Sequence, residues 1–559
     1  LYKDKCMKRA LLLFLLLLVI PTVSAAEAHV KLLALLEENG NSTGILADLS
    51  LETQPGSGRV FLDTFPLTKV ATQVSLRLAQ QVACTELDKE CGSTDFFYTI
   101  RASPGIVGGP SAGSSAAVLA AALISERELN ESVAMTGTIN SGGLIGPVGG
   151  TKNKLEAASK GGITKVLIPA GTSVYTDGNE STDLIAFGAT LGVEIIEVAT
   201  LDEALAHFTN KPVVRDEAPF VMDQTYSATM QKVANELCGE QPLTPRAENF
   251  TSISDTYAAQ GEYYSAASYC FRANLENTEH SLQGISFDAF QERLARELQD
   301  SFALNAEEHP LVTITDLQTY MLVKERIGEA QDALTKLTKE TSVTTENTRE
   351  LAYAIERLNS ARAWGTFFGT PGSKATFTNE SLRTSCEEKL GEAEERYNYV
   401  QTVYPEGLQQ TRKTLNHAEA QAKEGQYIIC LHEAAKAKSE ADSVLSVLGV
   451  EENRTDEIIS VKLAATQRAL ARAQAKQIFP IIGYSYYEYA KALQTEDKYS
   501  ALLFAEYANE LSTLDVYFAE SRPSLLVRVP LLSDILLVVG GIALGWILAS
   551  LFRPKKRKR

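Results

Sequence analysis

The residues of this chain that could do chemistry together are a serine and a lysine with no histidine between them. Ser111 stands in the sequence Gly-Pro-Ser-Ala-Gly, and Lys152 follows 41 residues later after a glycine pair. A serine hydroxyl becomes a useful nucleophile only when a base accepts its proton, and a lysine is a base only when it is neutral. Complete burial disfavours the ammonium and lowers a lysine pKa by roughly 3–5 units. The pair therefore indicates a hydrolase.

Local patterns predict the elements that position the serine. Residues 96–100 are mostly aromatic or β-branched and predict a buried strand. Residues 112–125 are small and apolar and predict a buried helix, so Ser111 would lie at a helix N-terminus. Free N–H groups and the positive end of the helix dipole can stabilise an oxyanion there. We expect the oxyanion and substrate loop to contain Gly108, Gly109, Ala112 and Gly113.

A second set of elements surrounds the lysine. Residues 133–139 predict a strand, and the glycine pairs at 142–143 and 149–150 allow tight turns. An amphipathic helix is expected from Lys152 to Lys160, with a strand at 165–169 behind it.

Several ordered sequence blocks resemble the proteolytic domain of Lon proteases. They are Gly-Ser-Gly-Arg at 56–59, Gly-Pro-Ser-Ala-Gly at 109–113, Ala-Met-Thr-Gly at 134–137 and Gly-Pro-Val-Gly-Gly-Thr-Lys-Asn-Lys-Leu-Glu-Ala-Ala at 146–158. The strand at 165–169 follows at the family's spacing, and the resemblance spans about residues 27–209. It implies an α/β (α+β) proteolytic domain that needs neither a metal nor a cofactor.

The resemblance also implies the roles of individual residues. Ser111 would be the nucleophile and Lys152 the general base, with Thr136 hydrogen-bonding near the lysine. Lys154 belongs to the same motif, but it falls at the position that the resemblance does not assign to the base.

Two departures from the family qualify the resemblance. Many Lon proteases carry an acidic residue two or three positions before the serine, where this chain has Gly108 and Gly109. The chain also lacks the Gly-x-x-x-x-Gly-Lys-Ser/Thr phosphate loop of the Lon ATPase module. It is therefore similar to the archaeal-type, membrane-anchored form without that module. Its expected substrates are unfolded or exposed polypeptides, and the family implies assembly into a ring such as a hexamer.

Other interpretations of the same residues remain open. The Gly-x-Ser-x-Gly pattern also fits the nucleophile elbow of α/β-hydrolases, which needs a later acid and histidine, and His207 is the candidate. Ser111 alone would be a helix cap, and Lys152 alone a solvated lysine. A different class of function is a catalytically silent Lon-like surface scaffold that carries a helical protein-binding module. Self-cleavage near 210–220 is a further possibility.

The two ends of the chain predict export and a membrane anchor. Residues 1–26 contain a basic start, a short apolar run and a small-residue cleavage site, as in a signal peptide. Residues 529–552 are long and apolar enough for a transmembrane helix, and a basic tail follows at 553–559. Because positive charge favours the cytoplasmic side, we expect a single-pass cell-membrane protein with most of the chain outside and its C-terminus in the cytoplasm.

Cysteines and sequons are compatible with export. Once Cys6 is removed with the signal, six cysteines remain, which allow 15 pairings, and we expect sequence neighbours to pair. The expected disulfides are Cys84–Cys91, Cys238–Cys270 and Cys386–Cys430. Acceptor sites for N-glycosylation stand at Asn41, Asn130, Asn179, Asn249, Asn379 and Asn453.

Composition divides the chain after the proteolytic domain, which we expect at 27–210. Residues 220–520 are poor in glycine and rich in helix formers, and they predict an all-α domain of helical hairpins similar to tetratricopeptide repeats, or a bundle. Hairpin turns are expected near 257–267, 425–427 and 497–501. The net charge of −17 argues against a nucleic-acid partner.

Overall fold

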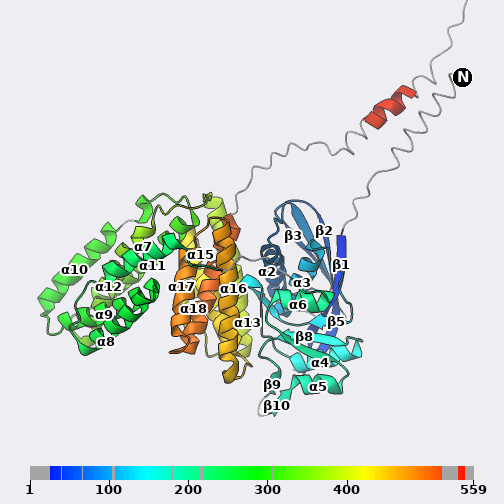
Figure 1. The fold of residues 1–559 in the computed structure, drawn as a ribbon, viewed down its shortest axis with the longest axis horizontal. Coiled ribbons are helices and arrows are strands. Elements are labelled where there is room, and N and C mark those ends of the chain that lie inside the picture. Colours follow the sequence, from blue (N-terminus) through cyan, green and yellow to red (C-terminus); the bar gives the residue numbers. More distant parts are fainter. Residues whose placement is uncertain are drawn as a thin grey trace, which may run out of the picture. The chain divides into compact units, whose positions relative to one another are not determined.

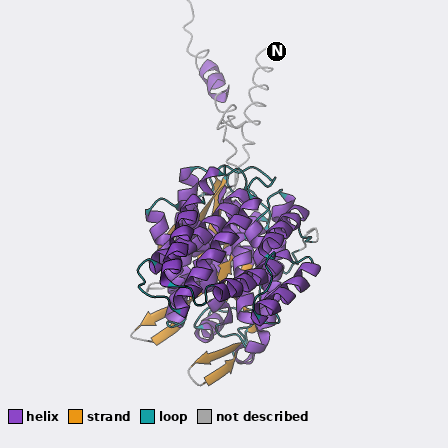
Figure 2. Ribbon diagram, turned by 90° about the vertical axis from the view of Figure 1, so that its left-hand side faces the viewer, coloured by secondary structure: helices purple, strands orange, loops and turns teal. Residues whose placement is uncertain are grey.

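The computed structural model describes residues 26–38, 41–65, 67–102, 108–177, 180–213, 220–304, 306–518 and 539–547. An α/β region, residues 26–209, comes first, and a helical region, residues 224–518, follows it (Figure 1). Figure 2 distinguishes the helices from the strands by colour. This order of the two kinds of structure agrees with the prediction. The described residues between Glu27 and Ala519 form one compact unit.

A mixed, mainly parallel sheet organises the α/β region. Its seven strands lie in the order β11-β8-β5-β1-β2-β4-β3. Strand β5 is parallel to β1 and β8, β8 is parallel to β11, and β4 is antiparallel to β2 and parallel to β3. The strands are β1 (Ala26–Glu38), β2 (Asn41–Pro55), β3 (Val60–Phe65), β4 (Thr94–Ala102), β5 (Val133–Met135), β8 (Lys165–Pro169) and β11 (Glu194–Val198).

Helices cover both faces of this sheet. Neighbouring residues of a strand point to opposite faces, and Leu32 and Leu33 of β1 accordingly belong to two separate hydrophobic cores. The core of Leu32 contains residues of α2 (Val70–Glu86), α3 (Gly113–Ile124) and α6 (Leu201–Thr209). The core of Leu33 contains residues of α4 (Thr151–Lys160) and α5 (Leu184–Thr190). Strands β9 (Val174–Asp177) and β10 (Glu180–Asp183) form a separate antiparallel pair.

The strand expected at 133–139 is divided in the structure. Strand β5 ends at Met135, and β6 (Thr138–Asn140) leaves the sheet to pair with β7 (Leu144–Gly146). The cause is local, because the Gly137 N–H donates to the carbonyl of Ser111 instead of to a neighbouring strand. The strands expected at 96–100 and 165–169 and the helices expected at 112–125 and 152–160 are confirmed within a few residues.

The helical region contains several helical hairpins. The three hairpin turns expected from the sequence are confirmed: they join α8 to α9, α14 to α15 and α17 to α18. The helices are α7 (Gln224–Leu237), α8 (Pro245–Ala259), α9 (Tyr263–Ser281), α10 (Phe287–Ala303), α11 (Ile314–Leu337), α12 (Thr345–Trp364), α13 (Asn379–Val403), α14 (Gln409–Lys423), α15 (Tyr427–Val447), α16 (Thr455–Ala475), α17 (Ile481–Leu493) and α18 (Lys498–Leu511).

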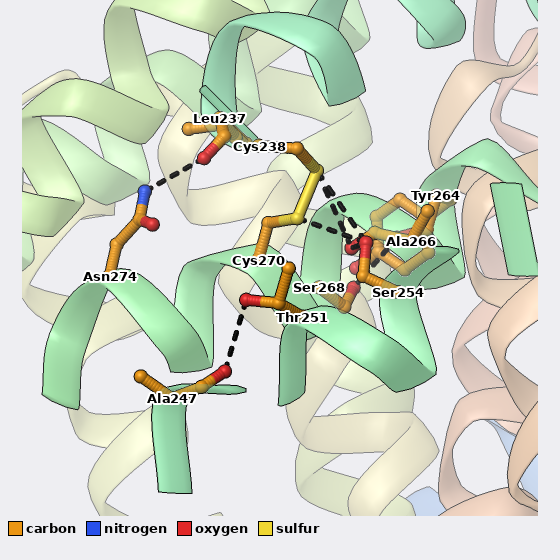
Figure 3. Close-up of a disulfide and its surroundings, with 10 residues drawn as sticks. All are labelled: Leu237, Cys238, Ala247, Thr251, Ser254, Tyr264, Ala266, Ser268, Cys270 and Asn274. Carbon is orange, nitrogen blue, oxygen red and sulfur yellow. Dashed lines mark hydrogen bonds between the residues drawn. A yellow bond between two sulfur atoms is a disulfide. The ribbon is translucent and has the colours of Figure 1, made fainter. Parts of the chain in front are cut away.

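The structure contains the three disulfides expected from sequence order. Cys84–Cys91 closes a short loop at the end of α2, and Cys386–Cys430 joins α13 to α15. Cys238–Cys270 joins the end of α7 to α9, and beside it the side-chain amide of Asn274 donates to the Leu237 carbonyl over 2.8 Å (Figure 3).

The expected transmembrane helix and the expected localisation need correction. Residues 539–547 are the described part of the segment 529–552, and they form a helix. Among the residues that the structure describes, none of the helices combines the length and apolar character needed to cross a membrane. The membrane-spanning element of the predicted fold class, the single-pass membrane localisation and the membrane partner are therefore not supported.

Several other expectations lie outside the described residues. These residues are 1–25 of the expected signal peptide, 214–219 of the segment proposed for self-cleavage, and the basic tail 553–559.

Candidate active site

Ser111 lies at the start of a helical run, as the sequence predicts. It is the middle residue of the short 3-10 turn Pro110–Ala112, which leads directly into α3. The turn begins after Gly109, whose φ of 116° suits glycine, and Pro110 occupies its first position. Ser111 is half-buried, so its side chain remains accessible from solvent while its backbone is held by the helix.

Two backbone hydrogen bonds fix the serine turn to the end of β5. The Gly137 N–H donates to the carbonyl of Ser111 over 3.3 Å, and the Ser114 N–H donates to the carbonyl of Gly137 over 3.2 Å. Thr136, the residue before Gly137, is itself held by an N–H bond of 3.1 Å to the carbonyl of Leu167 in β8. The backbone at Thr136 and the backbone at Ser111 therefore form one rigid unit.

The side chain that reaches Thr136 is that of Lys154. Its Nζ lies 3.1 Å from Thr136 Oγ1, and Lys154 is only 2% exposed. Burial lowers the pKa of Lys154 to about 7, because the ammonium loses its hydration in this position. A large fraction of Lys154 is therefore a neutral amine near neutral pH, which is the state a general base requires.

Lys152, the base expected from the sequence, has different surroundings. It is half-buried, and its Nζ lies 5.5 Å from the centre of the Phe187 ring, in a cation–π contact. The contact with Thr136 that was expected of the base is made by Lys154.

Helical periodicity explains why the two lysines differ. Thr151, Leu155 and Ala158 mark the buried face of α4, and Lys154 falls on this face, three residues after the first and four before the last. Lys152 lies off that face. The sequence predicts this helix as amphipathic, and the spacing of Lys154 from the apolar residues Leu155 and Ala158 is the signal within the sequence that distinguishes it from Lys152.

A left-handed glycine sets the direction of α4. Gly150, the residue before the helix, has φ of 67°, and its carbonyl accepts the Lys154 N–H over 3.2 Å. A side chain at this position would begin 2.4 Å from Leu35 Cδ1 in β1. The turn therefore requires glycine, both for its backbone conformation and for the close approach to the sheet.

Some of the residues expected to bind an oxyanion already form hydrogen bonds within the protein. The Gly113 N–H donates to the Pro110 carbonyl within the 3-10 turn. The Gly109 carbonyl accepts a hydrogen bond from Thr72 Oγ1 over 3.4 Å. A side chain on the exposed Gly108 would collide with Lys69, at 2.5 Å from its Cγ. Ala112 is half-buried beside the serine, and the assignment of these four residues to an oxyanion site stays a prediction.

The structure does not bring His207 into this arrangement. His207 is half-buried in α6, and within the described ranges no hydrogen bond or ion pair joins it to Ser111. The elbow interpretation is therefore not supported by a contact between these two residues.

One group of buried side chains could in principle hold a metal ion. Glu325, His432 and Glu433 place possible ligand atoms within 4.8 Å of one another in the helical region. The Glu325 carboxylate already forms an ion pair with the Lys436 ammonium. This ammonium supplies the local positive charge, and a divalent cation would be repelled by it.

Comparisons with known proteins agree with the geometry of the α/β region. Residues 93–208 match the family model of the Lon protease (S16) C-terminal proteolytic domain. The archaeal Lon protease of Methanothermobacter thermautotrophicus is 33% identical over 177 residues, which are 30% of this chain and 25% of that protein. The Lon protease of Lachnoclostridium phytofermentans is 41% identical over 99 residues, 18% of this chain and 12% of that protein.

A further similar protein is Lon protease 1 of Sorangium cellulosum, which is 37% identical over 111 residues, 20% of this chain and 13% of that protein. This chain thus spans a quarter or less of the length of these three curated relatives. The match to the family model lies within the α/β region.

Proposed function

We propose that this chain, whose α/β region carries the proteolytic domain of the Lon protease family, is a serine endopeptidase that uses Ser111 and Lys154 as a catalytic dyad. The observation that carries the proposal is the buried Lys154 amine at 3.1 Å from Thr136 Oγ1, on the backbone unit that also holds Ser111. The assignment replaces Lys152 by Lys154, two residues further along α4, and keeps Thr136 as the residue that orients the lysine.

In the proposed mechanism Lys154 accepts a proton in two steps, first from Ser111 and later from water. As the Ser111 hydroxyl oxygen attacks a peptide carbonyl carbon, its proton passes to the neutral Lys154 amine. The tetrahedral intermediate collapses, the C–N bond breaks, and the leaving amine takes the proton from the Lys154 ammonium. Water then loses a proton to Lys154 and hydrolyses the Ser111 ester, which restores the hydroxyl. Because Lys154 Nζ donates to Thr136 Oγ1, its lone pair is left for the proton of Ser111.

The substrates we propose are peptides and unfolded or exposed polypeptide segments. Without a phosphate loop in this sequence, cleavage would proceed without ATP, and folded substrates would not be unfolded by the chain itself. Assembly into a ring, which the family resemblance implies, stays a prediction.

The test is cleavage of unfolded casein and of a fluorogenic peptide library without ATP. The full chain is compared with Ser111→Ala, a change of one oxygen atom that leaves the backbone turn intact. We expect turnover by the wild type and its near-complete loss in Ser111→Ala, with the same thermal unfolding temperature. Absence of turnover in the folded wild type would reject the peptidase and favour the scaffold interpretation.

A further inference from the structure

A hairpin beside the candidate base is enclosed on all sides. Residues 138–146, which we call the β6–β7 hairpin, comprise β6, the turn Ser141–Gly143 and β7. Every residue from 133 to 147 is buried, although the hairpin stands outside the large sheet. Part of what buries it comes from the helical region, more than two hundred residues further along the chain.

Two residues of α18 bind the tip of this hairpin. The Asn509 side-chain amide donates to the Ser141 carbonyl over 2.6 Å, and the Ser141 hydroxyl donates to Glu510 Oε2 over 2.8 Å. All three residues are buried. The tip is therefore fixed to the helical region by hydrogen bonds that exclude water.

Helix α13 binds the chain at both sides of the hairpin. The buried guanidinium of Arg396 lies 3.5 Å from both Thr138 Oγ1 and the carbonyl oxygen of Ile139. One helical turn further on, the Tyr399 hydroxyl accepts the N–H of Gly149 over 2.9 Å. The two contacts use the same face of α13.

The two contacts of α13 lie close in sequence to the two residues of the Thr136–Lys154 hydrogen bond. Thr138 follows Thr136 by two residues, and Thr136 is the hydrogen-bond partner of Lys154. Gly149 precedes Gly150, whose carbonyl accepts the Lys154 N–H. Helix α13 thus holds both segments of chain whose separation sets the distance from Thr136 to Lys154.

We propose that Tyr399 is a positioning residue of the peptidase: its hydroxyl, supplied by the helical region, holds the Gly149 turn so that Lys154 stays buried against Thr136. This inference rests on the proposed function. It gives the helical region a part in the chemical step in addition to any part in recognising substrates.

The chemistry of the contact fits this role. Burial raises the pKa of Tyr399 to about 12, so its hydroxyl is neutral at physiological pH. A neutral phenol oxygen accepts an N–H bond and adds no charge near Lys154. In the part of the chain that the structure describes, burial is the cause of the lowered pKa of Lys154, and no charged side chain contributes to it. A change that lets water reach this lysine would therefore raise its pKa.

The experiment compares Tyr399→Phe with the wild type in the full chain. Tyr399→Phe removes one oxygen atom and leaves the ring in place. The matched control is Tyr397→Phe, on the same helix, because the Tyr397 ring packs on Arg412 within the helical region and is not part of the site. Peptide turnover is measured from pH 5 to 9, together with the thermal unfolding temperature of each protein.

We expect Tyr399→Phe to lower kcat roughly threefold to tenfold. The Gly149 N–H loses its hydrogen-bond acceptor, and the turn at residues 149–150 that precedes Lys154 becomes less rigid. KM should change less than twofold. The rise of kcat/KM with pH should move to higher pH, because a better hydrated Lys154 becomes neutral at higher pH. Tyr397→Phe should match the wild type in all three quantities.

Three other results have distinct meanings. An active wild type with an unchanged pH profile and kcat in Tyr399→Phe rejects the positioning role and leaves the peptidase intact. A loss of kcat that follows a lower folded fraction, with an unmoved pH profile, also rejects it, since the contact would then serve folding alone. A folded wild type without turnover rejects the proposed function and this inference with it.

Discussion

At the scale of single residues, the chemistry depends on which of two lysines is buried. Lys152 and Lys154 have the same side chain and lie two residues apart, but only Lys154 lies on the buried face of α4. Burial lowers the pKa of Lys154 to about 7, whereas a lysine in water is an ammonium at that pH. The proposed base thus differs from Lys152 in its burial.

Substitution of each lysine by alanine separates their roles. We expect Lys154→Ala to reduce kcat on a fluorogenic peptide by about 10²–10⁴-fold, which is typical of the loss of a general base. Lys152→Ala should keep at least half of the wild-type rate, because its Nζ lies over the Phe187 ring whereas the contact with Thr136 is made by Lys154. A reversed order of the two effects would return the base to Lys152.

The buried lysine also makes stability depend on pH. The unfolded chain binds a proton at Lys154 up to about pH 10.5, and the folded chain only up to about 7. Between these values the unfolded state binds more protons, so this residue makes the free energy of unfolding rise with pH, and its destabilising effect is largest below about 7.

We therefore expect Lys154→Met to be more stable than the wild type at pH 7 by a few kcal/mol, since each pKa unit corresponds to about 1.4 kcal/mol. Urea unfolding at pH 7 and pH 10 measures this gap, which should shrink at the higher pH. Ser111→Ala, which keeps the amine, should show the wild-type pH dependence. An equal gap at both pH values would contradict the assignment.

At the scale of elements, the packing of the β6–β7 hairpin against α18 requires a glycine at the tip of the hairpin. Gly142 has φ of 70°, and a Cβ placed there would lie 2.5 Å from Asn509 Oδ1 in α18. The backbone conformation and the contact with the helical region thus both require glycine at this position.

A pair of glycine substitutions tests this dependence. We expect Gly142→Ala to lower the free energy of unfolding by about 2–4 kcal/mol, through the strained φ and the displaced amide of Asn509. Gly149→Ala should change it by less than about 1 kcal/mol, because no atom lies within 4 Å of a Cβ there. Denaturant titration measures both, and equal losses would show that the tip is not specially constrained.

At the scale of the whole molecule, charged contacts join the helical region to the α/β region. Arg472 of α16 donates two hydrogen bonds to Glu86 of α2, of 3.1 and 2.6 Å, and Arg454 donates to Glu197 of β11 over 2.7 Å. Glu86 is almost fully buried, so its charge requires a partner. These pairs fix the orientation of the two regions beyond the hydrogen bonds of the β6–β7 hairpin.

The disulfides should stabilise the molecule according to the length of chain that they close. Cys386–Cys430 spans 44 residues and Cys84–Cys91 only 7. If a disulfide acts by lowering the entropy of the unfolded chain, removal of Cys386–Cys430 should lower the free energy of unfolding by about 1–2 kcal/mol more than removal of Cys84–Cys91. Serine pairs at 386 and 430, and at 84 and 91, should show this order in urea unfolding. A larger loss for the shorter loop would indicate that packing around the bond dominates.

The sequence by itself predicted several of the elements around Ser111 and the two lysines, and it indicated the class of chemistry that we propose. Local patterns of small, aromatic and β-branched residues predicted the helix after Ser111 and the strand at 165–169, because such preferences act within a few residues. Ordered motifs indicated the Lon proteolytic domain, and neighbouring cysteines indicated the disulfides. The C-terminal apolar segment shows the limit, since hydropathy alone predicted a spanning helix that the described residues do not support.

Helical spacing in the sequence separates the two lysines by face, but only the tertiary structure decided that Lys154 reaches Thr136 and what the helical region touches. The pKa of a lysine follows from the atoms that surround it, and those atoms come from the sheet, from α4 and from residues distant in the chain. The bond from Gly149 to Tyr399 joins residues 250 positions apart. No periodicity within the sequence encodes such a contact, because it exists only once both regions have folded and packed against each other.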